Sequence, residues 1–346
     1  MFRKYKIILC NWEYWSFNVV YTPIYFYWFW LSIKARSFFF FSTSNPSIEN
    51  SGFIMESKKA IYDILPTNLH PKTILIKLDV PQNALTEIVI SQKLQFPLVA
   101  KPNIGERGNG VKKLNNLQDV FKYQKNSTVD FLLQEWCSYP QEIGVFYCKY
   151  PNQKEGFITG IVKKEFFTII GNGIDTIEQL VLQNDRFFLQ LQTIKKQMPH
   201  DLNIVLDKGE QKILIPYGNH CRGTKFVDYS FKIDETLQRT FNSICSQIPG
   251  FYFGRMDIRF ENWELLKQGK NLSIIELNGA GSEPTHIYDP NHTIFFAWKE
   301  IIRHLNILFT IAKQNKQALN LSYLSLNQGL ELFKQKRQYN KLIKSV

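Results

Sequence analysis

Apolar positions along most of this chain follow the two spacings that predict strands and helices. Short apolar runs bounded by Pro, Gly or Asn predict β-strands, whereas apolar residues three or four positions apart predict helices. The strands expected on this basis cover residues 73–76, 96–100, 131–134, 143–150, 158–170 (as two antiparallel strands), 212–216, 253–260 and 272–277. The expected helices cover residues 56–65, 80–94 (after an approach loop), 117–123, 176–183 and the tail from 296 onward. Because these elements alternate without a regular βαβ period, the pattern favours an α+β fold over a doubly wound sheet.

The first 55 residues depart from this pattern. Residues 17–33, seventeen in all, carry no charged side chain and are rich in Tyr, Trp and Phe, and residues 38–41 form a second aromatic run. The stretch could pack against protein, lie on a membrane surface or cross a bilayer. Its length is at the lower limit for a hydrocarbon core of about 30 Å, and Pro23 would kink a helix. A span is therefore the least favoured of the three interpretations.

Composition indicates a globular protein of a reducing compartment. With 346 residues, 44% of them hydrophobic, the chain can bury a large core and form two or three subdomains. Its five cysteines are scattered, odd in number and without a C-x-x-C pair, which argues against a disulfide scaffold or a zinc cluster. No signal-peptide pattern is evident. We therefore expect a cytoplasmic protein, either free or held peripherally at a membrane.

The formal charge of +12 is concentrated at the two ends of the chain. Residues 1–36 carry +4 and residues 311–346 carry +6, which leaves only +2 for everything between them. No nucleic-acid recognition motif accompanies these basic ends, so nucleic acid is not expected as a partner. An anionic membrane surface is the better candidate, because the aromatic stretch lies within the basic N-terminal segment.

Two neighbouring segments could bind phosphate. Lys101 follows a predicted buried strand and could neutralise phosphate oxygens as a point charge. Shortly after it, Gly105, Gly108 and Gly110 supply three glycines in six positions, enough for backbone N–H groups to close over phosphate. The loop is neither a Walker A loop nor G-x-G-x-x-G, and a glycine loop alone is more often a surface turn.

Two later strands carry oxygen ligands. Arg255, Asp257 and Arg259 alternate on one predicted strand and so share a face, as do Glu276 and Asn278 on the next. Two carboxylates and an amide on paired strands suit Mg²⁺, with Mn²⁺ as an alternative, whereas the histidines show no zinc spacing. The bland interpretation is a set of cross-strand ion pairs.

In their order and spacing, these segments resemble the nucleotide site of ATP-grasp enzymes. The segments that carry the resemblance are 96–102, 105–110, Gln134–Glu135 with Glu142, 254–257 and 276–278. The resemblance implies an ATP-grasp fold, in which two α+β lobes hold ATP between antiparallel sheets. It also implies that residues 134–137, including Cys137, present the adenine edge and that Glu142 binds the ribose.

Two further stretches narrow the resemblance to carboxylate–amine ligases. Residues 171–180, followed by Asn184 and Arg186, look like the G-D-G-x-x-T-I-x-x-L stretch of cyanophycin synthetases and fused bacterial glutathione synthetases. Residues 219–225 resemble their segment beside the γ-phosphate, and Lys163 or Lys164 matches a basic position before the first stretch. The Gly-Arg-x-Asp of residues 254–257 is closer to D-alanine–D-alanine ligases.

The resemblance assigns roles residue by residue. Lys101 would bind the α- and β-phosphates beneath the glycine loop, which includes Arg107, and Lys59, or its neighbour Lys58, would be the second phosphate-side lysine. Asp257, Glu276 and Asn278 would hold Mg²⁺. The catalytic candidates are Arg255, Arg222 and Lys225. The two arginines would stabilise the transferring phosphoryl group.

The sequence also departs from the ligase pattern. Only about 55 residues precede the first candidate lysine, whereas D-alanine ligases have a full α/β domain there. Asn172 stands at the Asp of the G-D-G motif, and an unusual segment, residues 279–286, follows the metal ligands. Within it, Glu283 and His286 either contact a distinct acceptor or only shape a loop. These departures put an amino-acid substrate in doubt.

The expected organisation is an aromatic segment at residues 1–55, an ATP-grasp domain at 56–310 and a basic helical tail at 311–346. Within the domain, the small lobe would cover about 96–150 and the large lobe about 151–310. The expected function is an ADP-forming ligase that uses ATP and Mg²⁺ to join a carboxylate to an amine or a thiol. The alternatives are a membrane-associated ATP-binding protein without turnover and an ATP-dependent kinase of the same fold.

Overall fold

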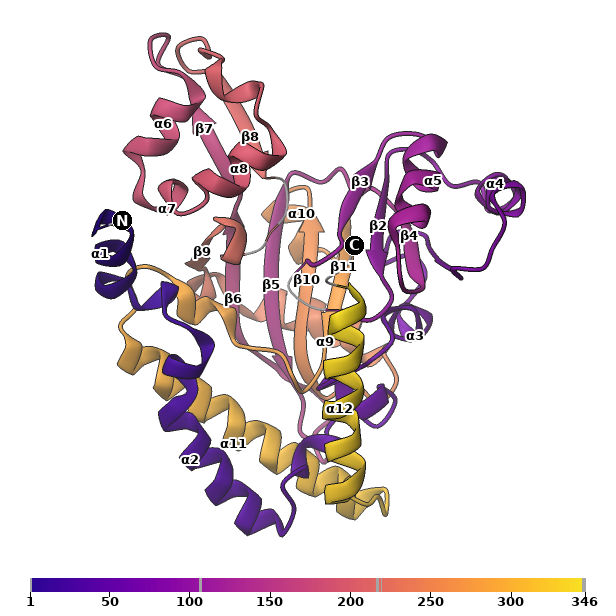
Figure 1. The fold of residues 1–346 in the computed structure, drawn as a ribbon. Coiled ribbons are helices and arrows are strands. Elements are labelled where there is room, and N and C mark those ends of the chain that lie inside the picture. Colours follow the sequence, from indigo (N-terminus) through magenta and orange to yellow (C-terminus); the bar gives the residue numbers. More distant parts are fainter. Residues whose placement is uncertain (1, 106–107, 216–217, 219, 344–346) are drawn as a thin grey trace.

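The computed structural model describes residues 2–105, 108–215, 218 and 220–343, and in these ranges the strands form three antiparallel sheets (Figure 1). The four-stranded sheet has the order β1-β4-β2-β3, the five-stranded sheet β11-β10-β5-β6-β9, and the small sheet β7-β8. The strands are β1 (Thr73–Ile76), β2 (Leu98–Pro102), β3 (Lys112–Leu114), β4 (Phe131–Glu135), β5 (Gln141–Cys148), β6 (Phe157–Glu165), β7 (Phe167–Ile170), β8 (Gln211–Ile215), β9 (Lys225–Asp228), β10 (Phe253–Phe260) and β11 (Leu272–Asn278).

Helices cover the outer faces of these sheets, and most begin at a polar cap. Ser57, Asn116 and Thr293 each accept a backbone N–H of the first turn, and Thr176 forms a capping box with Gln179. The helices are α1 (Phe2–Cys10), α2 (Phe17–Ala35), α3 (Lys58–Ile64), α4 (Gln82–Ser91), α5 (Leu117–Asn126), α6 (Ile177–Gln183), α7 (Asp185–Phe188), α8 (Leu191–Gln197), α9 (Glu235–Ser246), α10 (Trp263–Lys267), α11 (Ile294–Ala318) and α12 (Leu326–Ile343).

The α+β class predicted from the pattern is confirmed, and each predicted strand and helix lies within a few residues of an observed one. One expected pairing is wrong. β6 and β7 are not partners of each other, because β6 pairs with β5 and β9 whereas β7 pairs with β8. Local pattern could not decide this, since both strands have the same alternation and their partners lie far away in the sequence. The pattern also missed the strands β3 and β9 and the helices α1, α2, α7, α8, α9 and α10.

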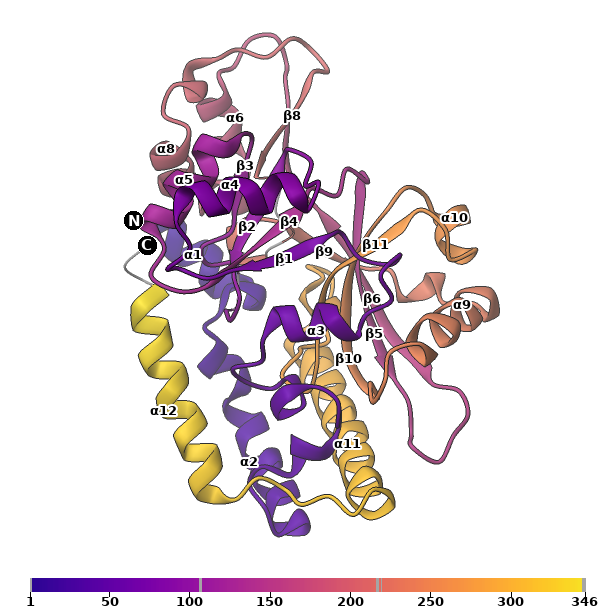
Figure 2. The same cartoon turned by 90° about the vertical axis from the view of Figure 1, so that its right-hand side faces the viewer.

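Two hydrophobic cores define two lobes. In the first, α4 and α5 pack on the four-stranded sheet through side chains such as Leu85, Val120 and Phe131. In the second, α9 and α10 pack on one face of the five-stranded sheet, as Figure 2 shows. The small lobe differs from the expected 96–150: its sheet draws on residues 73–135, because β1 pairs with β4, while β5 lies in the centre of the larger sheet.

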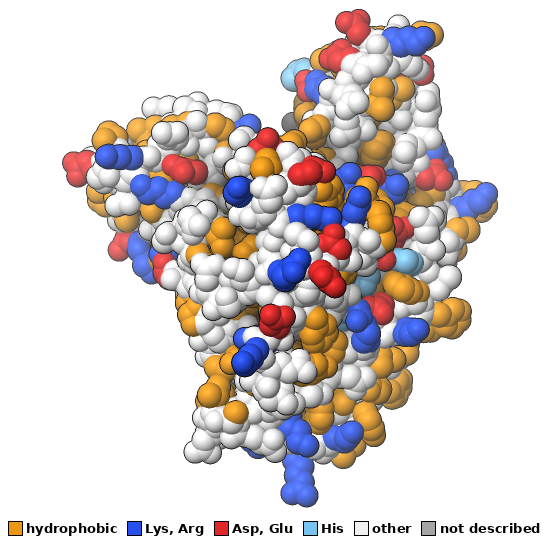
Figure 3. Space-filling model, turned by 180° about the vertical axis from the view of Figure 1, so that it is seen from behind, with side chains coloured by type: hydrophobic (Ala, Val, Ile, Leu, Met, Phe, Trp, Pro, Cys, Tyr) orange, Lys and Arg blue, Asp and Glu red, His pale blue; other side chains and the backbone are white. Residues whose placement is uncertain are grey.

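The aromatic N-terminal segment packs against the body of the protein. α2 lies along α11 at the end of the molecule away from β7 and β8 (Figure 1), and Phe39, Phe40 and Phe41 are buried in a third core with residues of β5, β10 and α11. The outer side of α2 stays exposed, with Phe26 at 76%. Seen from behind in Figure 3, hydrophobic side chains gather along the lower right side of the molecule, where α2 and α11 lie. None of the helices in the described ranges combines the length and apolarity that a bilayer crossing requires.

Candidate functional site

A cavity of about 850 Å³ lies between the four-stranded sheet, the inner face of the five-stranded sheet and the N-terminal segment. Strand alternation decides which side chains reach it. Along β10, Met256 and Ile258 enter the large-lobe core, whereas Arg255, Asp257 and Arg259 line the cavity. The shared face predicted for these residues, and the one for Glu276 and Asn278, are therefore confirmed: register pairs Asp257 with Glu276 and Arg255 with Asn278.

Lys101 reaches the cavity from the small lobe. On β2, Leu98 and Ala100 are buried in the small-lobe core, so Lys101 projects to the opposite side. Its Nζ donates to Tyr62 Oη (2.8 Å), Gln134 Oε1 (2.9 Å) and the Ile275 carbonyl oxygen (3.3 Å). Burial, reinforced by the nearby charge of Lys58, lowers the pKa of Lys101 to about 7. The contact with Ile275 places this lysine one residue from Glu276, on the facing lobe.

The second lysine beside Glu276 is Lys58, so the assignment of Lys59 is wrong. Lys58 Nζ lies 2.6 Å from Glu276 Oε1. Burial opposes ionisation of Glu276, but the charge and hydrogen bond of Lys58 outweigh it and lower the pKa of Glu276 to about 2. Lys59 instead pairs with Asp63 one turn along the same helix. The physical reason is the helical repeat: Lys58 shares a face with the buried Ile61 and Tyr62, and the next residue is turned away by about 100°.

A ladder of buried ion pairs crosses the inner face of the five-stranded sheet. Lys164, whose side chain is 4% exposed, lies between Glu142 Oε1 (2.9 Å) and Asp257 Oδ2 (3.0 Å). Arg259 Nε binds the other oxygen of Glu142 (2.9 Å), and Arg255 Nε binds the other oxygen of Asp257 (2.9 Å). Burial lowers the pKa of Lys164, but the two carboxylates outweigh it, so the pKa is raised and the lysine stays charged.

This ladder bears on the ribose role expected of Glu142 and on the choice between Lys163 and Lys164. Each oxygen of Glu142 already accepts a charged hydrogen bond, so a ribose hydroxyl would have to share an oxygen with Lys164 or Arg259. Of the two lysines, Lys164 is buried and lines the cavity, whereas Lys163 points to Tyr229. The partners of Lys164 could not be predicted from the sequence, because Glu142 and Asp257 lie on strands that are far apart along the chain.

The three residues expected to hold Mg²⁺ are not equally suited to bind it. Glu276 Oε1 is bound by Lys58, and the Asn278 side chain lines the cavity, where its amide oxygen, and not its unpaired Nδ2 donor, is the atom that could hold a metal. Both oxygens of Asp257 are bound by cations. In the described residues, no group of three or more His, Cys, Asp or Glu side chains is placed to hold a metal. Glu276 and Asn278 thus fit a magnesium ion shared with phosphate, whereas Asp257 would first have to exchange a cationic partner.

The glycine loop lies at the cavity beside Arg222. Gly108 and Gly110 have φ of 69° and 71°, and a Cβ at Gly110 would lie 2.8 Å from Pro102 Cγ, so these positions need glycine. Arg222 Nη2 donates to the Gly108 carbonyl (2.9 Å) and therefore joins the loop to the large lobe. Gly105 also lines the cavity. Arg107, assigned to the same loop, lies outside the described residues.

The segment between the lobes also lines the cavity. Gln134, Glu135 and Cys137 are all cavity residues, as the expected adenine-binding position requires, and Gln134 also holds Lys101. Trp136 faces the same space and lies beneath the Lys113 ammonium, 4.5 Å from its ring centre. Its flat ring is a surface that the sequence interpretation did not single out.

Lys225 does not belong to the site. Strand β9 alternates, so Phe226 is buried toward the cavity and Lys225 points outward, where it lies 3.6 Å from Glu165 with nearly half of its side chain exposed. Its assignment as a catalytic residue is therefore wrong. Motif matching placed it beside Arg222 in sequence, but a single step along a strand reverses the direction of a side chain.

In the segment after β11, Glu283 and His286 have different surroundings. Glu283 Oε1 accepts hydrogen bonds from Tyr21 (2.6 Å) and Tyr288 (2.9 Å) at the cavity wall. His286 is buried and pairs with Glu300 (3.3 Å), so it shapes the loop. The Tyr21 contact could not be foreseen, because it joins positions 262 residues apart.

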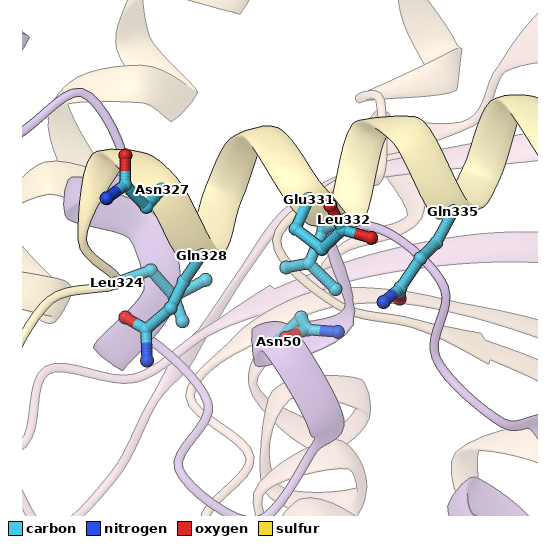
Figure 4. A pocket seen from close by; sticks show the side chains of 7 residues that line it. All are labelled: Asn50, Leu324, Asn327, Gln328, Glu331, Leu332 and Gln335. Carbon is cyan, nitrogen blue, oxygen red and sulfur yellow. The ribbon is translucent and has the colours of Figure 1, made fainter.

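Another hollow lies outside this site. It measures about 480 Å³ and lies between α12 and the turn at Asn50, where Figure 4 shows Leu332 above Asn50. Its lining contains amide side chains, two leucines and Glu331, but no basic residue. It therefore lacks the charge that a phosphate would need.

Comparison with known proteins gives structural neighbours only. No family model and no curated protein sequence matches the chain. Among solved structures it is similar to a bifunctional glutathione synthetase from Pasteurella multocida (14% identity, TM-score 0.38), over 72% of this chain and 36% of that one. It is also similar to D-alanine–D-alanine ligase from Bacillus anthracis (12% identity, TM-score 0.40), over 76% and 67% of the two chains.

A third neighbour is carboxyaminoimidazole ribonucleotide synthase from Aspergillus clavatus in complex with ATP (11% identity, TM-score 0.37), over 64% of this chain and 44% of that one. The first two neighbours are of the kinds of ligase whose motifs the sequence resembles. With TM-scores below 0.5, the similarity decides neither activity nor substrate.

Proposed function

We propose that this protein is an ATP-grasp ligase that activates a carboxylate with ATP and joins it to an amine or a thiol. One observation carries the proposal. A buried lysine of the small lobe, Lys101, lies in one cavity with Glu276 and Asn278 of the large lobe, and its Nζ is 3.3 Å from the Ile275 carbonyl oxygen. These residues are remote in sequence, and nothing in a stable core requires them to meet.

The charges of the cavity suit a triphosphate. Lys58, Lys101 and Arg255 are basic residues that line it, and Arg222 lies beside the glycine loop. In a water-poor site such groups stabilise phosphate charge far more strongly than in bulk water, and they need no reorganisation when charge moves. Lys58 is now neutralised by Glu276, so we expect phosphate to draw it away from that carboxylate.

The reaction would have two steps that balance. A carboxylate oxygen attacks the γ-phosphorus of ATP, the bond to the β,γ-bridging oxygen breaks, and ADP leaves. The amine or thiol then attacks the acyl carbon, inorganic phosphate leaves with the electron pair of the C–O bond, and the nucleophile loses its proton. Arg255 and Arg222 would stabilise the phosphoryl oxygens in both steps, and catalysis would come from positioning and charge.

A magnesium ion, when bound with ATP, would neutralise phosphate charge, and Glu276 and Asn278 are the residues that would hold it. What this chain contributes on its own is the Glu276 carboxylate, now paired with Lys58, and the Asn278 amide at the cavity wall.

Phosphate release tests the proposal. Purified protein with ATP and Mg²⁺ should release phosphate and ADP when a suitable acid and amine are both present, and acids, amino acids and dipeptides can be screened in pairs. A stable phosphorylated acid without amide would indicate the kinase alternative. ATP binding without release under any pair would favour the non-turnover alternative, which the proximity of the exposed aromatic face of α2 to the cavity makes worth testing. Absence of ATP binding would contradict the proposal itself.

A further inference from the structure

The cavity changes from charged to aromatic along single strands. At alternate positions of β10 its lining reads Arg259, Asp257, Arg255 and then Phe253. These positions span about 20 Å at the usual rise of a strand. On β11 and the loop that follows it, Asn278 gives way to Ala280. Arg255 therefore stands at the boundary between a polar chamber and an apolar one.

Two helices wall the apolar chamber with stripes of helical spacing. From α2 the lining residues are Phe17, Tyr21, Ile24, Tyr25 and Trp28, which recur three or four positions apart. From α11 they are Ile301, His304, Leu305 and Leu308, with the same spacing. Burial lowers the pKa of His304 to about 3, so this histidine is neutral and adds no charge. Along α11 the stripe is about 10 Å long.

Buried donors in this chamber have no partner within the protein. Trp15 Nε1, Trp28 Nε1 and Thr285 Oγ1 are buried without a hydrogen-bond partner, and all three residues line the cavity. Thr285 is 7% exposed. By contrast, the indole N–H groups of Trp12 and Trp298 each bind a backbone carbonyl. Donors are rarely left unpaired in a sealed core, because an unpaired buried donor loses its hydrogen bonds to water without replacement. These unpaired donors distinguish the chamber from a sealed core and mark it as a space that a ligand can enter.

We infer that the acid activated by this protein has an extended apolar body, which lies in the chamber between α2 and α11. Its carboxylate would lie beside Arg255, next to the phosphates, and the body would run past Phe253 and Ala280 to the two helical stripes. This inference rests on the proposed function for the chemistry of the carboxylate, but the chamber is a feature of the structure itself. A small amino acid would leave this apolar surface uncovered.

Straight-chain acids of increasing length test the inference. Acetate, butyrate, hexanoate, octanoate and decanoate are titrated below their micelle concentrations, with and without ATP, by calorimetry and by tryptophan fluorescence. Each two added methylenes should tighten the Kd about tenfold, because they are buried. A Kd that does not change with chain length would overturn the inference.

A chamber-filling variant locates the binding. Leu305→Trp adds bulk on the α11 stripe and should remove the chain-length gain while the Kd for ATP stays unchanged. Leu319→Trp, on the exposed residue that ends the same helix, is the matched control and should behave as wild type. A chain-length gain that survives Leu305→Trp would mean that acids bind elsewhere, and weaker ATP binding in Leu305→Trp would mean that the base occupies the chamber. Either result overturns the inference.

The experiments distinguish a failure of the ligase proposal from a failure of the chamber inference. If long acids bind but ATP does not, the chamber stands and the ligase proposal fails. If ATP binds and short acids stimulate phosphate release while long acids do not, the ligase proposal stands and the chamber inference fails.

Discussion

The two ends of the cavity lie on the same face of the five-stranded sheet. They differ in what stabilises their side chains, which is ion pairing at one end and apolar packing at the other. At the charged end, carboxylates such as Glu142 and Asp257 are matched with lysine and arginine, bond by bond. Behind the aromatic end, core side chains such as Phe40 and Phe41 are fully buried, and their packing is close and mostly non-directional. Burial of apolar area is the main source of stability, whereas a buried ion pair does little more than offset its desolvation. The aromatic core behind that end should therefore carry most of the stability, whereas the charged end should carry the binding of ATP.

Removing one core ring is expected to have the largest effect. Phe40 is 0% exposed and packs against Trp28 and Phe309. Phe40→Ala should lower the free energy of unfolding by about 3–5 kcal/mol, measured by urea denaturation. The matched control is Phe26→Ala on the exposed side of α2, which should change it by no more than about 0.5 kcal/mol. An unchanged midpoint in Phe40→Ala would mean that the N-terminal segment is not part of the folded core.

Removing one cation from the charged end should affect binding and leave the fold stable. Lys101→Met keeps the length of the side chain but removes the ammonium beside Tyr62 and Gln134. The loss of charge-assisted hydrogen bonds should weaken ATP binding about 10- to 150-fold, measured by calorimetry. Lys59→Met, which alters the outward lysine paired with Asp63, should bind ATP as wild type. Equal effects of the two changes would contradict the orientation of α3.

The outer side of α2 gives a smaller expected effect. The helix is apolar all round, yet Phe26, Phe29 and Trp30 are exposed, and contact of this surface with a membrane is the hypothesis to test. Replacing all three by serine should reduce sedimentation with anionic vesicles about fivefold or more. Phe231→Ser, at an equally exposed ring elsewhere, is the control. If the pellet fraction does not change, the membrane proposal is discarded.

The smallest expected effect is the uptake of a proton when ATP binds. Because burial lowers the pKa of Lys101 to about 7, the lysine is largely neutral at pH 8 in the free protein. Phosphate would restore its charge, so ATP binding at pH 8 should take up as much as about 0.9 proton, and affinity should fall as pH rises above 7. Calorimetry in buffers of different ionisation enthalpy measures this uptake, which Lys101→Met should remove. Equal uptake in the variant would assign the proton to another group.

Much of the fold was predictable, because alternation along a strand is a local property. The sequence correctly placed Arg255, Asp257 and Arg259 on one face, and the structure shows them at the cavity. Where two neighbouring residues were both candidates for one role, the local pattern did not show which of them faces the cavity. Lys58 and Lys59 differ only in helical phase, and the outward direction of Lys225 depends on which side of β9 meets the sheet core.

The sequence by itself determined which residue types recur at strand and helix spacing, and so the α+β class, the alternating charged face and the glycine loop, since each depends on neighbours within a few positions. Tertiary structure alone decided that Lys164 lies between Glu142 and Asp257 and that Tyr21 binds Glu283. It also decided that the aromatic N-terminal segment closes the cavity. These contacts join parts of the chain that meet only when the lobes pack, and their strength depends on burial, which no local pattern specifies.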